Sequence, residues 1–68
     1  MKFDVYGRFR IEVVREGDAW KAYLLELGKR SRMNELIIPS SLQASELAVY
    51  LDDLYHEKAG PGQSVREV

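Results

Sequence analysis

Hydrophobic and polar side chains alternate strictly near the start of the chain. Odd positions from Phe3 to Val13 are apolar or glycine, and the even positions between them are mostly polar. An alternation of period two is typical of a strand with one buried face. The alternation has the same phase on both sides of Gly7. It therefore predicts a bulge or bend at Gly7, within one long strand or two collinear strands over residues 2–15.

A second apolar run, residues 19–27, follows the turn signal Glu16-Gly17-Asp18. A two-residue turn at Glu16-Gly17 would pair Val13 with Trp20, so that the apolar sides of both strands meet. The same register sets Glu12 opposite Lys21 on the other face.

Two shorter segments follow the predicted hairpin. Residues 28–32 are polar and basic, which is typical of a connection, and residues 35–38 predict a short third strand that Pro39 ends. A capping-box pattern at 40–43 then precedes a helix that we expect to begin between 41 and 45 and to end near Lys58.

The element order β-β-β-α predicts the α+β fold class, as a three-stranded antiparallel meander with one C-terminal α-helix packed on one face. We expect a single domain over residues 1–59 and a flexible C-terminal tail over 60–68. The expected core consists of Phe3, Val5, Phe9, Ile11, Val13, Trp20, Ala22, Leu24, Leu36 or Ile37, Leu47, Leu51 and Leu54.

Composition narrows the classes of protein that fit. The 68 residues include one histidine and no cysteine. The absence of cysteine excludes disulfides and zinc sites with thiolate ligands. The net charge of −1 argues against a dedicated nucleic-acid or membrane-surface protein. No apolar stretch is long enough to span a bilayer, so we expect a cytoplasmic protein. No phosphate loop or catalytic motif is present, so we expect no cofactor and no enzymatic activity.

Asp52, Asp53 and His56 are the candidate metal or acid–base residues, since their spacing allows contact along a helix. Helical periodicity places them opposite the apolar side of the helix, however, where charged residues normally face water. We therefore interpret them as a solvated face and predict no catalytic residue and no metal site.

A basic cluster offers a nucleic-acid hypothesis. Lys29, Arg30 and Arg32 lie in the connection, and Arg8 and Arg10 have the outward parity of the first strand. Such a group could contact phosphates. A nucleic-acid-binding domain of three-stranded-sheet-plus-helix type is therefore the alternative function.

The side chains predicted on the uncovered face of the sheet suggest a protein-interaction surface. One helix covers one face, yet the other face carries tyrosine, leucine and arginine, a composition typical of interfaces. Alternatively, Leu25 and Leu27 tuck under the 28–34 connection or the tail. The leading hypothesis is a non-enzymatic module that self-associates, as a possible homodimer, or docks a protein partner. Its candidate residues are Tyr6, Arg8, Arg10, Tyr23, Leu25 and Leu27.

Four motifs carry a resemblance to a known group: VYGRF at 5–9, WKAYLL at 20–25, IIP at 37–39 and ELAVYLDDLYHEKA at 46–59. On these, the chain resembles a group of short uncharacterised bacterial proteins known as a domain of unknown function. The resemblance implies a small stand-alone cytoplasmic protein and supplies no activity, substrate or catalytic residue.

Overall fold

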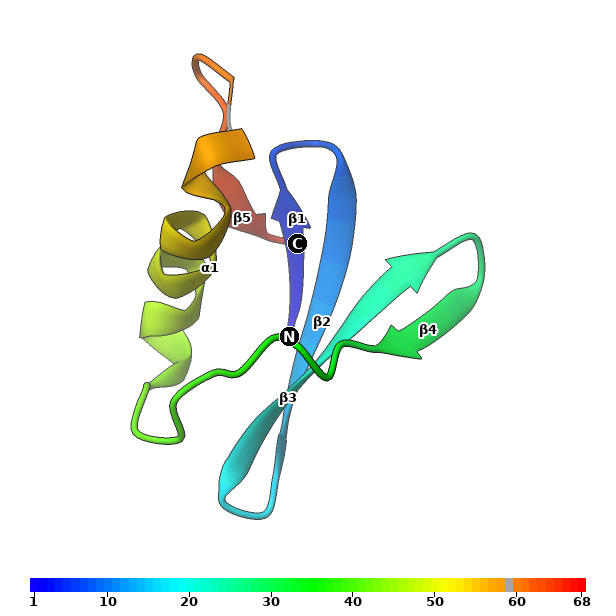
Figure 1. The fold of residues 1–68 in the computed structure, drawn as a ribbon, viewed down its shortest axis with the longest axis vertical. Coiled ribbons are helices and arrows are strands. Elements are labelled where there is room, and N and C mark those ends of the chain that lie inside the picture. Colours follow the sequence, from blue (N-terminus) through cyan, green and yellow to red (C-terminus); the bar gives the residue numbers. More distant parts are fainter. Residues whose placement is uncertain (59) are drawn as a thin grey trace.

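The computed structural model describes residues 1–58 and 60–68 as one antiparallel sheet with a helix beside it (Figure 1). The sheet has five strands in the order β4-β3-β2-β1-β5. The strands are β1 (Lys2–Val5), β2 (Phe9–Glu16), β3 (Ala19–Glu26), β4 (Lys29–Arg32) and β5 (Val65–Glu67). The α+β class is confirmed, whereas the predicted number of three strands is wrong.

The alternating stretch at the start of the chain is a hairpin, not one bent strand. Val5 pairs with Phe9, and Tyr6 and Gly7 between them have φ of 57° and 70°. Because the connection has an odd number of residues, partners across it share the same parity. The alternation therefore runs unbroken through a complete reversal of the chain, which explains why the prediction missed the turn.

The β2–β3 turn lies one residue later than predicted, at Gly17-Asp18, so Val13 pairs with Ala22 rather than with Trp20. Glu12 lies opposite Tyr23 and not opposite Lys21. This register differs from the predicted one by two residues along β3. A shift of two leaves every side chain on the face that the alternation assigned to it.

The predicted basic connection and the predicted third strand have exchanged roles. The basic residues form β4, which pairs with β3 through the tight turn at Leu27-Gly28. Residues 35–38 are not a strand but part of an extended crossover to the helix. Closing a hairpin with a two-residue turn costs little conformational entropy. Residues 29–32 therefore pair with β3, although the more apolar residues 35–38 follow them.

The helical segment has the predicted extent. It consists of η1 (Ala44–Glu46), α1 (Leu47–Tyr55) and η2 (His56–Lys58). Its cap is one turn later than predicted, because the backbone N–H of Gln43 donates to Glu46 Oε1 at 2.8 Å.

The helix packs over β1 and β5, and not over the middle of the sheet (Figure 1). Leu47 and Leu51 are fully buried there, and Ile38 of the crossover joins them. Leu54, which was predicted in the core, is 47% exposed. The reason is that α1 packs over β1 and β5 and not over the middle of the sheet, which leaves this side chain partly exposed.

The C-terminal segment completes the sheet where a loose tail was expected. Val65 pairs with Val5 in antiparallel β5, and the Val68 N–H donates to the Lys2 carbonyl at 2.9 Å. This short strand fills the space between β1 and the helix.

The core is close to the predicted one, with specific differences. Tyr6 and Ile38 are buried without having been predicted, whereas Ile37 is exposed. Phe9, Trp20 and Leu36 are half-buried and pack at the margin of the core, and Leu24 is half-buried. The buried residues are Phe3, Val5, Tyr6, Ile11, Val13, Ala22, Ile38, Leu47 and Leu51.

Among the described residues, no helix combines the length and the apolar character that crossing a bilayer requires.

Substitutions at two leucines of α1 can test which side of the helix faces the sheet. Leu51→Ala leaves a cavity against the sheet and should lower the free energy of unfolding by about 2–5 kcal/mol. Leu54→Ala is the matched control and should have a much smaller effect, because this side chain is 47% exposed. Urea denaturation followed by circular dichroism measures both values. Equal losses would show that the helix packs in the predicted orientation instead.

Candidate functional site

The sheet has one face toward the helix and the crossover, and one face that nothing covers in the described part of the chain. The second is called the open sheet face below, and alternation with the observed registers defines it. Its side chains are Lys2, Asp4, Arg10, Glu12, Val14, Glu16, Ala19, Lys21, Tyr23, Leu25, Arg30, Arg32 and Arg66.

The open sheet face is basic although the chain is not. It carries six basic and three acidic side chains, an excess of three positive charges, whereas the whole chain has a net charge of −1. The acidic residues of the helical segment lie on the other side of the molecule. The fold therefore separates charges that are mixed along the sequence.

The middle of the open sheet face is built around the ring of Tyr23. The Arg30 guanidinium lies 3.8 Å from the centre of this ring, and Arg30 Nε also donates to Glu12 Oε1 at 2.7 Å. The Tyr23 hydroxyl donates to Glu16 at 3.0 Å. Together with half-buried Val14 and Leu25, these contacts form a pre-arranged amphipathic surface on rigid strands.

Other basic groups on this face are held only loosely. Arg10 Nε and Arg66 Nη2 each lie 3.9 Å from a carboxylate oxygen of Asp4, and both side chains are largely exposed. Exposed pairs at this distance contribute little to stability, and salt screens them. These arginines therefore remain available to a charged partner.

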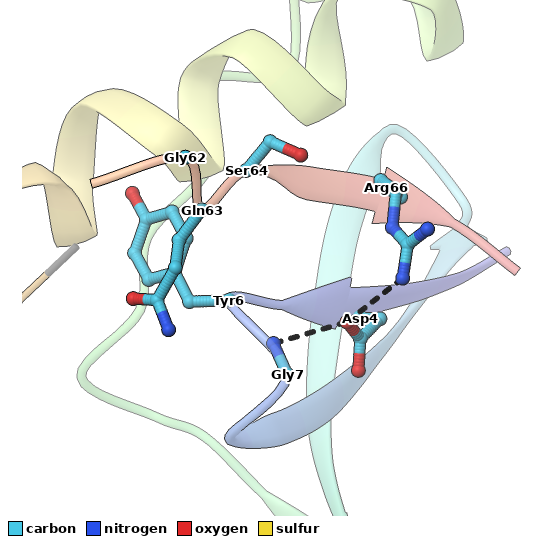
Figure 2. Close-up of a pocket in the computed structure, with 7 residues that line it drawn as sticks. All are labelled: Asp4, Tyr6, Gly7, Gly62, Gln63, Ser64 and Arg66. Atoms are coloured by element: carbon cyan, nitrogen blue, oxygen red, sulfur yellow. Dashed lines mark hydrogen bonds and ion pairs between the residues drawn. The ribbon is translucent and has the colours of Figure 1, made fainter. Parts of the chain in front are cut away.

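A polar pocket of about 340 Å³ lies at the β1–β5 end of the molecule (Figure 2). Figure 2 shows Asp4 between the Gly7 N–H, which donates to it at 3.1 Å, and the Arg66 guanidinium. Gln63 and Ser64 complete the rim. The Asp4 carboxylate accepts one hydrogen bond, from the Gly7 N–H of the β1–β2 turn, while Arg10 and Arg66 lie near it only as loose ion pairs.

Some of the candidate interaction residues predicted from the sequence lie together on the open sheet face, and others lie elsewhere. Arg8 lies in the β1–β2 turn, Leu27 at the tip of the β3–β4 hairpin, and Lys29 on the helix side of β4. The prediction that Tyr6 lies on the outward face is wrong, because its side chain is buried against the helix. The candidates brought together on the open sheet face are Arg10, Tyr23, Leu25, Arg30 and Arg32.

The sequence reasoning missed three basic residues of the open sheet face. Lys2 and Lys21 have the outward parity and were recognisable by it. The sequence around Arg66 has no alternation that would predict a strand. Its position on this face results from the pairing of β5 with β1, which places it opposite Asp4.

Asp52, Asp53 and His56 have different environments in the structure. Asp53 and His56 are exposed on the helix, as predicted. Asp52 differs from the prediction, because its carboxylate accepts a hydrogen bond from the Tyr6 hydroxyl at 2.5 Å. The Asp52 carbonyl accepts from the same hydroxyl at 3.0 Å. Among residues 1–58 and 60–68, no group of acidic and histidine side chains is arranged to hold a metal ion.

The surroundings of the Tyr6 hydroxyl raise its pKa. Burial is the main cause, with the hydrogen bond to Asp52 and the negative charges of Asp52 and Asp53 adding to it, and together they raise the pKa of Tyr6 to about 12. Tyr6 thus remains a donor to the helix at any physiological pH.

The geometry can now be compared with known proteins. The sequence model of a family described as a domain of unknown function, DUF7661, matches residues 1–68. The chain belongs to this family. No curated protein and no solved structure matches the chain. The description of this family names no activity.

The raised pKa of Tyr6 predicts how stability changes in alkali. The folded state holds this proton up to about pH 12 and the unfolded state only up to about pH 10. Its contribution to the free energy of unfolding is therefore complete below pH 10 and is lost between pH 10 and 12. Urea denaturation across this range should show a shallower decline for Tyr6→Phe than for the native chain. Groups that both proteins share cancel in the difference, and parallel declines would contradict the prediction.

Proposed function

We propose that the protein is a non-enzymatic interaction module that docks an acidic region of a protein partner through the open sheet face. The observation that carries the proposal is the excess of three positive charges around the half-buried Val14, Tyr23 and Leu25. A basic surface steers an acidic partner, and the central apolar groups can then be buried on contact.

The composition of this face fits protein docking. Tyrosine and arginine are enriched at interfaces, because each combines a large contact area with directional hydrogen bonds. Tyr23 and Arg30 already hold each other in place, so ordering them on binding costs little entropy. The proposed non-catalytic role is supported by the same contacts, since the Glu12 and Glu16 carboxylates already accept hydrogen bonds from Arg30 and Tyr23.

Nucleic-acid binding is the second candidate function. It is supported by Arg10, Arg30 and Arg32, which lie on one face and could follow a phosphate backbone. Two features favour a protein instead. Arg30 is engaged by Glu12, and the one tyrosine of this face lies beneath a guanidinium, where it cannot stack on a base.

The docking proposal is tested by reversing charge on the open sheet face. The native chain should capture a protein from a lysate of its source organism, and the purified partner should bind it in calorimetry. The double variant Arg10→Glu with Arg32→Glu should weaken this affinity by about tenfold or more and reduce its salt dependence. Arg8→Glu reverses a charge in the β1–β2 turn, outside the face, and should bind as the native chain does.

Two results would contradict the docking proposal. One is a partner whose affinity is unchanged by the double variant. The other is binding to duplex DNA or RNA with a steep linear dependence of log K on log salt, abolished by the double variant, while no protein partner is captured. That second result would establish the nucleic-acid function in its place.

A further inference from the structure

Leu27 stands out at the tip of the β3–β4 hairpin. Its relative exposure is 105%, so it has no burial in the single chain, and its φ of 36° lies in the left-handed region. Gly28 after it has φ of 81°. A two-residue turn with positive φ at both positions favours asparagine or glycine at the first of them. Leucine at this position has an unfavourable backbone conformation, and its apolar side chain is exposed to water in the single chain.

An apolar groove opens beside the same hairpin, on the helix side of the sheet. Phe9, Leu24, Met33 and Tyr55 line it, and its volume is about 460 Å³. The rings of Phe9 and Tyr55 meet edge to face with centroids 5.4 Å apart, which gives the groove a firm wall. It stays open because α1 packs over β1 and β5 and does not reach this end of β3.

The rim of the groove is acidic. Glu26 and Glu35 lie at its edge. Glu35 lines the same groove as Tyr55, and burial together with the charge of Glu35 raises the pKa of Tyr55. A ligand suited to the groove therefore combines an apolar group with a basic one.

The hairpin beside the groove offers this combination. Lys29 pairs with Glu26 in the β3–β4 register, so its side chain lies on the groove side of the hairpin. Leu27, at the tip between them, supplies the apolar group. Leu27 follows groove residue Leu24 by three positions on the same hairpin. Two copies related by a two-fold axis can therefore exchange these contacts reciprocally, as a closed interface requires.

We propose that two copies of this chain form a two-fold dimer in which Leu27 of each copy enters the groove of the other. Lys29 then lies beside Glu35 of the opposite groove. The proposal goes beyond the docking function, because it uses the helix side of the hairpin. It leaves both open sheet faces outside, so the dimer presents two docking surfaces and gains affinity for a partner with repeated acidic segments.

Leu27→Asn tests the dimer without endangering the fold. Asparagine suits the left-handed position, so this variant should unfold at the same temperature as the dilute native chain or at a higher one. Its dimer dissociation constant should nevertheless rise by about tenfold or more. Sedimentation velocity from micromolar to millimolar concentration measures the change. A native chain that is monomeric throughout, or a variant that associates as strongly as the native chain, would overturn the proposal.

Two further variants locate the interface. Val49→Asn replaces another exposed apolar side chain, 65% exposed on α1, and should associate as the native chain does. Lys29→Glu should weaken the dimer, and Glu35→Lys in the same chain should restore it. Loss of association in Val49→Asn, or a double charge variant no better than Lys29→Glu alone, would place the contact elsewhere. None of these residues lies on the open sheet face, so failure here leaves the docking function standing.

Discussion

The hydrogen bond between Tyr6 and Asp52 is the contact on which the arrangement of this small fold depends. Tyr6 has a left-handed backbone at the β1–β2 turn, buries its ring and donates its hydroxyl to the helix. Its backbone N–H donates to the Ser64 carbonyl at 3.2 Å, at the start of the segment that becomes β5. One residue thus joins a turn, a helix and an edge strand. Such a backbone conformation in a large residue persists only where the surroundings fix it, and here they do.

This contact also determines what the molecule leaves uncovered. Because α1 is held over β1 and β5, it cannot extend over β3 and β4, and the β3–β4 hairpin projects away from it (Figure 1). The helix side of that hairpin retains an apolar groove, and the opposite side of the whole sheet retains its open face. Both surfaces therefore result from the position of one helix on a sheet that is wider than the helix.

The two surfaces differ in chemistry in a way that suits separate tasks. The open sheet face is basic, and its central side chains are fixed by the contacts among Arg30, Tyr23 and Glu12. The groove is apolar with an acidic rim, and it lies next to a strained, exposed Leu27. A chain with a small core has much to gain from self-association, since burying further apolar area adds directly to its stability. The outward sheet faces can then serve a different partner.

The sequence by itself determined which side chains share a face and where the helix lies. Alternation keeps its phase through a three-residue turn and through a register shift of two. Arg10, Tyr23 and Leu25 were therefore assigned to the correct face, although the β1–β2 turn was missed and the β2–β3 turn was misplaced by one residue. The apolar periodicity and the stop signal after Lys58 placed the helix, although its cap lies one turn later than the 40–43 pattern predicted. Only the tertiary structure decided that Val65–Glu67 is a strand, that Tyr6 is buried and that basic residues gather on one face. Three residues carry too little periodicity to reveal a strand, and the conformation of Tyr6 depends on a partner 46 positions away. Contacts over that distance form because the packed helix and sheet bring the residues together, and no local pattern encodes them.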